Sequence, residues 1–195
     1  MLPAEPPTVE AAPSGAATLF TLGEGTVARY RVEEELASTG FFVAVGETTD
    51  VAGSIAFDAD GAVIADQSRL AVQAATLRTD SNRRDGYVRN RTLETDTYPE
   101  VVFQPTSVDN LEWPPTTNFP VAFTLTGDLT IKDRTEQVVW DVQAVFAEGG
   151  TMKGLATVEF TFDDFGMDKP RVAVVLSVDD TIRLELNLTG TLTSQ

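Results

Sequence analysis

The sequence contains neither cysteine nor histidine among its 195 residues. Without cysteine, a disulfide, a zinc–thiolate site or a cysteine nucleophile is excluded, and without histidine so is a Ser-His-Asp triad. General acid–base catalysis near neutral pH would depend on carboxylates, lysine or tyrosine with strongly shifted pKa values. A metal site could use only oxygen ligands, as for Ca²⁺ or Mg²⁺. We therefore predict a protein that is not an enzyme, with no catalytic residue, no metal and no cofactor.

Basic residues are also scarce. Lysine and arginine total 14 against 30 aspartates and glutamates, which gives a net charge of −16. Such a surface repels nucleic acid and anionic membranes, so we predict no nucleic-acid partner. No apolar run approaches the length of a membrane-spanning helix, so we predict no stable membrane insertion. The net charge favours solubility and weighs mildly against self-association.

Residues 1–17 are rich in proline and alanine and lack the basic and apolar segments of a signal peptide. This composition is typical of a linker that follows an export signal or a lipid anchor. We predict a flexible linker over 1–17, one domain over 18–195, and a location outside the cytoplasm, which is periplasmic, secreted or lipid-anchored. On this hypothesis an export signal was removed and Met1 was added for expression. A disordered cytosolic N-terminus is the alternative.

Beyond the linker, apolar residues recur at every second position, which predicts half-buried strands. Residues 121–131 show the pattern most clearly, because Phe123 and Leu125 alternate with Thr124 and Thr126. Similar alternation covers 28–32, 51–57, 70–74, 101–103, 138–142, 156–162 and 182–188. About eight strands joined by short turns predict an all-β protein, an antiparallel eight-stranded barrel or else a sandwich.

One segment breaks the alternation and predicts a short helix over about 80–91, near the barrel mouth, with Asp80 as its N-cap. Its arginines are Arg83, Arg84, Arg89 and Arg91. One interpretation is an anion-holding lip for a phosphate or carboxylate head group, which the planar guanidinium suits. The alternative is internal pairing that fixes the helix over the mouth, with acidic partners among Asp80, Asp85, Glu94 and Asp96.

Two acidic pairs, Asp163-Asp164 and Asp179-Asp180, stand near predicted strand ends. They could suggest a calcium site or glycoside chemistry, but neither has the spacing of a calcium loop. Aspartate at strand ends favours turns, which is the interpretation we prefer. Trp113-Pro-Pro interrupts two strands and predicts a stiff loop with a packed tryptophan rather than a membrane anchor.

The segment at 79–90 (TDSNRRDGYVRN), followed by LETDTYP at 93–99, resembles a motif of the YceI-like family of polyisoprenoid-binding proteins. Three further segments are similar to the family in the same order: GDLTIKDRTEQV at 127–138, DFGM at 164–167 and VDDTI at 178–182. Order and spacing agree over residues 26–190. Tyr87, Asn90 and Phe162 stand where the family has histidine, serine and arginine.

The resemblance implies a lipocalin-like barrel that holds an amphiphile along its axis: an isoprenoid, an isoprenoid quinone or a fatty chain. An eight-stranded barrel is just wide enough for one such ligand. A homodimer is possible on the same resemblance. The alternative is an interaction domain with a filled core and a protein partner. The predicted ligand-binding residues are Phe57, Val72, Arg84, Tyr87, Arg89, Phe103, Phe123, Leu125, Trp140, Phe160, Phe162, Leu184 and Leu186.

Overall fold

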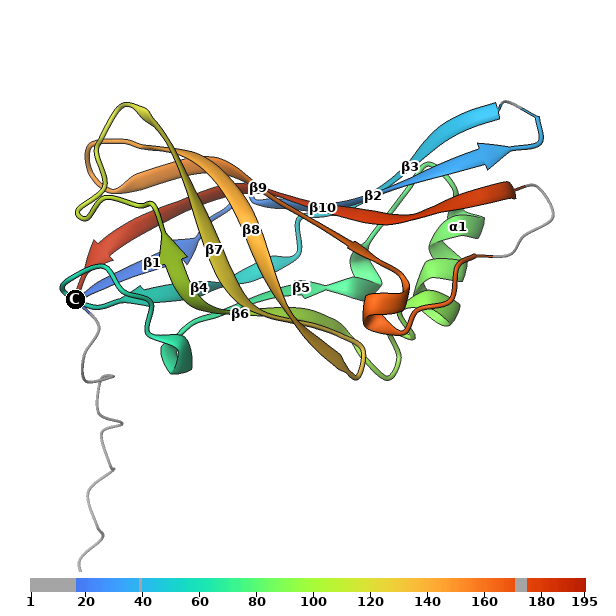
Figure 1. Cartoon of the computed structure of the whole chain (residues 1–195), viewed down its shortest axis with the longest axis horizontal. Coiled ribbons are helices and arrows are strands. Elements are labelled where there is room, and N and C mark those ends of the chain that lie inside the picture. The colour runs from blue at the N-terminus through green and yellow to red at the C-terminus, as the bar shows by residue number, and fades with distance from the viewer. Residues whose placement is uncertain (1–16, 39, 171–174) are drawn as a thin grey trace, which may run out of the picture.

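Antiparallel strands around one interior make up most of the chain in the computed structural model, which describes residues 17–38, 40–170 and 175–195 (Figure 1). The strands are β1 (Thr18–Leu22), β2 (Val27–Leu36), β3 (Gly40–Thr48), β4 (Val51–Phe57), β5 (Arg69–Gln73), β6 (Glu100–Asp109), β7 (Pro120–Ile131), β8 (Arg134–Phe146), β9 (Thr151–Thr161) and β10 (Val175–Ser194). The helical elements are η1 (Ala65–Gln67), η2 (Ala74–Thr76), α1 (Asn82–Tyr87), η3 (Val88–Thr92) and η4 (Asp163–Phe165). Apart from Ala17, the predicted linker lies outside the described residues.

The sheet closes on itself. Its strand order runs β1-β4-β5-β6-β7-β8-β9-β10, and β10 pairs back to β1. Strands β1 and β2 pair one after the other with the same edge of β10, and β4 and β3 pair with them in turn. Each of these two successive pairs, β1 with β2 and β3 with β4, therefore counts as one of the eight strands of the barrel. The predicted antiparallel eight-stranded barrel is therefore confirmed. The alternation pattern missed β1 and β3, because β1 is short and β3 carries apolar residues on both faces.

Strand β10 is the seam of the barrel. Along one edge it pairs with β9, from Thr181 to Thr191. Along the other edge it pairs with β2 near its start and with β1 near its end. A closed sheet leaves few unpaired edges, so the backbone hydrogen bonds are satisfied within the wall itself.

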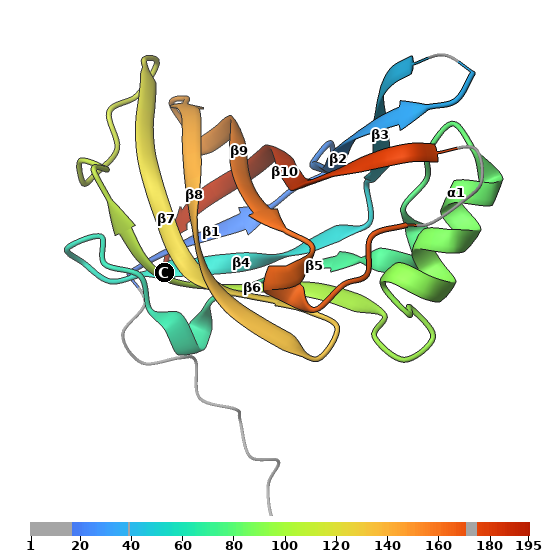
Figure 2. The same ribbon diagram turned by 45° about the vertical axis from the view of Figure 1, so that its right-hand side comes forward.

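Alternation along each strand places apolar side chains inside. In β8 the buried residues are Val138, Trp140, Val142, Ala144 and Phe146, while every residue between them is exposed. At the end of the barrel where the C-terminus lies, Trp113 of the loop after β6 packs against Phe57, with ring centroids 5.0 Å apart. The α1–η3 segment lies at the opposite end (Figure 2). The two ends of the barrel are therefore covered by different kinds of structure.

The predicted helix near the mouth is present, with a corrected start. Ser81 rather than Asp80 is the N-cap, because the Ser81 hydroxyl accepts a hydrogen bond from the Arg84 amide at 3.4 Å. The Asp80 carboxylate instead pairs with the Arg84 guanidinium one turn away. The helix then continues as η3, so helical structure extends to Thr92. None of the described helices has the length and apolar character needed to cross a membrane.

The acidic pairs differ in position. The Asp164 carboxylate accepts hydrogen bonds from the Thr161 amide at 2.7 Å and the Thr161 hydroxyl at 2.8 Å, which closes the turn into η4. Asp179 does not stand at a strand end, contrary to the prediction. It lies within β10, where the register with β2 shifts between Val178 and Ile182, and its carboxylate accepts from the Thr181 amide at 2.8 Å. The local turn at Asp179 is a bulge inside a continuous strand.

Two glycine substitutions should shift stability in opposite directions. Gly53 has a φ of 136°, and an added Cβ would lie 2.1 Å from the Arg69 carbonyl oxygen of the paired strand. We expect Gly53→Ala to lower the free energy of unfolding by about 2 kcal/mol or more. Gly86 has open space around it in α1, so Gly86→Ala should raise stability by about 0.5–1 kcal/mol. Urea denaturation followed by tryptophan fluorescence measures both, and a shift of the two midpoints in the same direction would contradict the steric argument.

Candidate functional site

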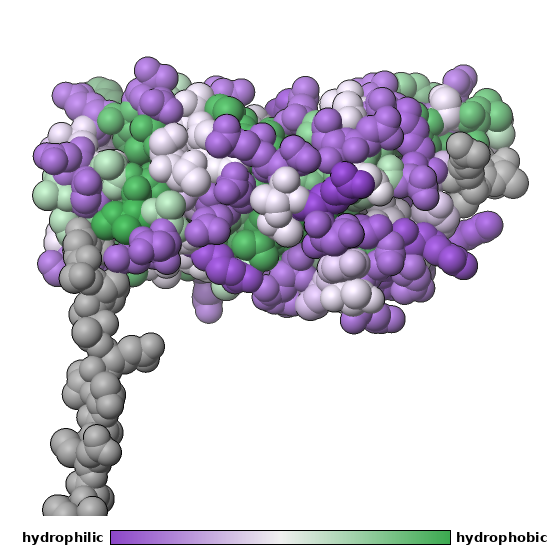
Figure 3. Space-filling view, turned by 60° about the horizontal axis from the view of Figure 1, so that its bottom comes forward, coloured by the Kyte–Doolittle hydropathy of each residue, from purple (hydrophilic) through white to green (hydrophobic). Residues whose placement is uncertain are grey.

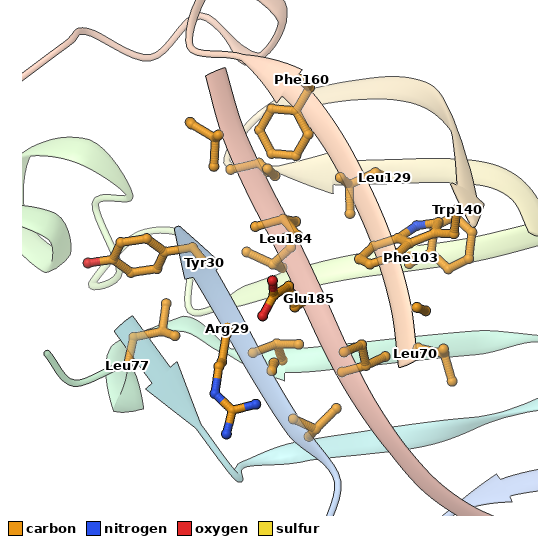
Figure 4. Close-up of a pocket in the computed structure, with 18 of the residues that line it drawn as sticks. Arg29, Tyr30, Leu70, Leu77, Phe103, Leu129, Trp140, Phe160, Leu184 and Glu185 are labelled. Atoms are coloured by element: carbon orange, nitrogen blue, oxygen red, sulfur yellow. The ribbon is translucent and has the colours of Figure 1, made fainter. Parts of the chain in front are cut away.

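The barrel encloses a cavity of about 460 Å³. This volume lies within the range of roughly 300–1,000 Å³ that is typical of pockets for small ligands. Inward-facing apolar side chains from both halves of the barrel wall form most of its lining, among them Leu129, Leu184 and Phe103 (Figure 4). The cavity follows the barrel from the α1 end to the loop that carries Trp113.

Three glycines of the barrel wall lie close to aromatic side chains. A Cβ on Gly46 would lie 2.2 Å from the ring of Tyr30, which is its partner across β2 and β3. A Cβ on Gly127 would lie 2.8 Å from the Phe103 ring, and one on Gly190 2.4 Å from the Phe20 ring. Each of these rings therefore lies close to the backbone of the barrel wall, at a position where any residue larger than glycine would clash with it.

The structure brings almost all the predicted ligand-binding residues to this cavity. Those on its wall are Phe57, Val72, Arg84, Tyr87, Phe103, Phe123, Leu125, Trp140, Phe160, Phe162, Leu184 and Leu186. Arg89 is not part of the lining, and its Nη1 atom is buried without a hydrogen-bond partner among the described residues. Contact of these residues with a ligand stays a prediction.

Several lining residues were not in the predicted set. Tyr30, Ile55 and Leu129 stood on the apolar face of predicted strands, so the alternation pattern could have identified them. Phe20 belongs to β1, which the pattern missed, and Trp113 belongs to a loop. For these two, no local periodicity signals an inward position.

At the α1 end the lining becomes polar through Ser81, Arg83, Arg84 and Glu34. Arg84 pairs with Asp80 and, at 3.5 Å, with the carboxylate of Glu34, whose side chain is 8% exposed. Its guanidinium carbon lies 5.3 Å from the centroid of the Phe42 ring, a cation–π geometry. Arg84 thus ties α1 to β2 and β3, as the internal-pairing interpretation expects of it.

The other charged residues of the segment behave differently. The buried Asp85 carboxylate accepts from the Thr79 amide at 2.8 Å and the Thr79 hydroxyl at 2.7 Å rather than pairing with an arginine. Glu94 pairs with Lys132. Arg83 is exposed, lines the cavity and forms no ion pair within the described ranges. It is therefore the arginine whose charge is available at the cavity.

Three lining residues carry buried polar atoms that have no hydrogen-bond partner in the described part of the chain: the Tyr30 hydroxyl, the Thr92 hydroxyl and the Trp140 indole nitrogen. Such atoms are rare, because buried polar groups are normally hydrogen-bonded. Burial raises the pKa of Tyr30, and the nearby Asp85 and Glu34 carboxylates raise it further, although Arg84 acts in the opposite sense. The Tyr30 phenol is therefore neutral over the physiological range.

The carboxyl groups with a shifted pKa give little support to catalysis by a carboxylic acid. The hydrogen bonds from Thr161 lower the pKa of Asp164, and those from Thr181 lower the pKa of Asp179. Burial acts to raise the pKa of Glu185, but pairing with Arg31 and Arg183 lowers it overall. A general acid would need the opposite shift. The described residues hold no group of three or more side chains that could ligate a metal ion.

The sequence model of the YceI-like domain matches residues 27–190. The chain belongs to the YceI-like family. Solved structures share the fold at low identity. A polyisoprenoid binding domain from Saccharophagus degradans, implicated in plant cell wall breakdown, matches with a TM-score of 0.69 and 10% identity, over 91% of this chain and 99% of that one.

Two further structures are similar. BcnA from Burkholderia cenocepacia matches with a TM-score of 0.62 and 17% identity, over 85% of this chain and 96% of that one. The YCEI protein of Campylobacter jejuni matches with a TM-score of 0.54 and 18% identity, over 77% and 85% of the two chains. No curated protein matches the chain. At these identities the structures establish the YceI-like barrel as the fold.

The raised pKa of Tyr30 predicts a loss of stability at high pH. Above about pH 10 a tyrosine ionises in the unfolded chain, whereas Tyr30 keeps its proton in the folded chain. The folded state then binds more protons, so stability present below that pH falls as the pH rises. Urea unfolding at pH 7 and above about pH 10 should show this fall for the wild type and a smaller one for Tyr30→Phe.

At pH 7 the same variant should keep its free energy of unfolding within about 1 kcal/mol, because the hydroxyl it removes has no partner. An equal pH slope in Tyr30→Phe and wild type would show that other groups account for the loss. A large loss of stability at pH 7 would show that the hydroxyl does have a partner.

Proposed function

We propose that this protein binds an amphiphilic lipid inside the barrel and carries or sequesters it, without catalysing a reaction. The observation that carries the proposal is the apolar cavity of about 460 Å³ within a closed barrel. An isoprenoid, an isoprenoid quinone or a fatty chain fits this chemistry. The name of the Saccharophagus degradans relative, a polyisoprenoid binding domain, supports the same class of ligand.

The energetics favour a hydrocarbon chain. Each buried methylene contributes about 0.8 kcal/mol, so a chain of ~15 carbons gains roughly 12 kcal/mol before other terms. Association and ordering of the chain offset an estimated 4–15 kcal/mol of this gain. Long chains are therefore favoured over short ones. Because the sheet is already closed, the hydrogen bonds of the barrel wall need not change when a chain binds.

The ends of the barrel suggest an orientation. Trp113 packs on Phe57 at one end, where the lining is apolar, whereas Arg83, Ser81 and the Tyr30 hydroxyl lie toward α1. We propose that the chain points toward Trp113 and that the head group lies near Arg83. Arg84 contributes mainly by holding α1 in place, because its charge is already paired.

The alternatives have less support. An interaction domain with a filled core does not fit an interior that contains a cavity. A carboxylate enzyme needs raised pKa values, but among the described residues the pKa is lowered at each carboxyl group that shows a shift: Glu100, Asp164, Asp179 and Glu185. YceI-like proteins are generally periplasmic, which supports the proposed location outside the cytoplasm. The linker over 1–17 and a possible homodimer stay predictions.

A bulky side chain on the cavity wall should exclude the ligand. Leu184 points inward between Tyr30 and Val158 of the neighbouring strands, so the larger side chain in Leu184→Trp would occupy part of the cavity. We expect wild-type protein to retain a near-stoichiometric hydrophobe in native mass spectrometry and in organic extraction, and Leu184→Trp to retain little. The matched control is Val139→Trp, because Val139 lies on the outer face of β8 and is 53% exposed; this variant should bind as wild type does. Wild-type protein that is ligand-free and ignores fatty-chain and quinone probes would refute the proposal.

Arg83 and Arg84 should respond differently to substitution, because Arg84 has ion-pair partners among the described residues and Arg83 has none. We expect Arg83→Ala to weaken binding of a fluorescent fatty-chain probe with a carboxylate head by about tenfold, with thermal stability unchanged. The same chain with an alcohol head should bind equally to wild type and variant. Arg84→Ala should instead lower the free energy of unfolding by about 1–3 kcal/mol, because it leaves the buried Glu34 carboxylate unpaired.

Arg91→Ala is the control, since Arg91 is exposed and is not part of the lining. If Arg83→Ala binds both probes as wild type does, the head group lies elsewhere. If Arg84→Ala lost affinity with full stability, Arg84 would contact the head group directly.

A further inference from the structure

Two large apolar side chains are exposed at the α1 end of the barrel. Phe41 of β3 is 69% exposed, and Leu176 of β10 is 64% exposed. Both strands flank β2 at the same level, because Phe41 and Ser177 each stand opposite Glu35. The strands β2, β3 and the start of β10 extend here beyond the strands β4 to β9 (Figure 1). Hydrophobic side chains also interrupt the polar surface at this end in the space-filling view (Figure 3).

This exposed surface is continuous with the cavity. Leu36 and Val175 line the cavity and are register partners of each other. Leu176 follows Val175 in the chain, and Phe41 stands opposite the residue that precedes Leu36. We call these four residues the apolar tip. The tip spans the three adjacent strands β10, β2 and β3 and places exposed apolar side chains beside the apolar lining, whereas Trp113 packs at the opposite end.

We propose that the apolar tip docks on an uncharged lipid surface and that the ligand passes there between the bilayer and the cavity. This inference rests on the proposed function. A long-chain amphiphile resides in lipid rather than in water, so a carrier must approach a bilayer at the entrance of its cavity. Exposed large apolar residues beside an entrance are unfavourable in water, and burial in lipid removes that penalty.

The charges select the kind of surface. Glu33 and Glu35 are exposed on β2 beside the tip, and the whole chain carries a net charge of −16. The net charge of the chain would repel it from an anionic bilayer, although Arg83 at this end is an exposed cation, whereas a zwitterionic bilayer would not repel it. A protein partner fits less well, because stable protein interfaces use roughly 20–30 residues a side and the apolar tip has four. The association with lipid is therefore weak and reversible, which suits a carrier that must leave again.

Flotation with phosphatidylcholine vesicles tests the proposal. We expect a fraction of the wild-type protein to float, and a smaller fraction when phosphatidylglycerol is added to the vesicles. The floating fraction of the double variant Phe41→Ser/Leu176→Ser should be smaller by a factor of about ten or more. The matched control is Phe119→Ser, which removes a 65% exposed phenylalanine next to the first residue of β7, at the end near Trp113. It should float as wild type does.

Two further measurements separate docking from ligand binding. Transfer of a fluorescent fatty-chain probe from vesicles to the double variant should slow by the same factor as flotation falls, while equilibrium affinity for the probe in solution stays unchanged, because Phe41 and Leu176 do not line the cavity. The chain has no cysteine, so Phe41→Cys accepts a single polarity-sensitive fluorophore. Its emission should shift to shorter wavelength on addition of vesicles.

Several results would overturn the inference. The double variant floating as wild type does would exclude the apolar tip, and an equal loss in Phe119→Ser would indicate non-specific adsorption. A change in oligomeric state of the double variant without any vesicle binding by wild type would assign the tip to a second copy of the chain. Wild-type protein that does not bind the probe in solution would instead remove the proposed function itself.

Discussion

Strand β10 holds the barrel closed, because its twenty residues pair with β9 along one edge and with β1 and β2 along the other. Without this seam the sheet would be open, and its inward face would have to pack on itself or on another layer. With the seam in place, the wall satisfies its own backbone hydrogen bonds. Inside this wall the structure holds both a buried apolar cluster and a cavity of about 460 Å³.

The two ends of the barrel divide the properties of the cavity between them. Near the chain terminus, Trp113 and Phe57 close the interior with an aromatic contact. At the other end, Arg84 fixes α1 to the strands by an ion pair with Glu34 and a contact with Phe42, while Arg83 keeps an available charge. The same end carries the apolar tip. A closed apolar end and a polar, accessible end are what an amphiphile with one head group requires.

Much of the fold could be predicted, because alternation is local. Phe123 and Leu125 indicated a strand with one buried face, and the same period placed Trp140 and Leu184 inside. The alternation pattern failed where apolar residues occupy both faces of a strand or where a contact between distant residues decides the local structure. Strand β3 is apolar on both faces, Asp179 lies at a bulge inside a strand, and the N-cap is Ser81, whose hydroxyl accepts the Arg84 amide, while Asp80 pairs with the Arg84 guanidinium.

The sequence by itself determined the barrel class, most of the inward side chains and the family, since all three depend on the order and period of residues along the chain. Only the tertiary structure decided that the interior is hollow. The cavity depends on how side chains from different strands pack, such as Tyr30 against Gly46, and no local pattern records such contacts. The division of roles between Arg83 and Arg84 was decided in the same way, because the partner that occupies Arg84, Glu34, is fifty residues away in the chain.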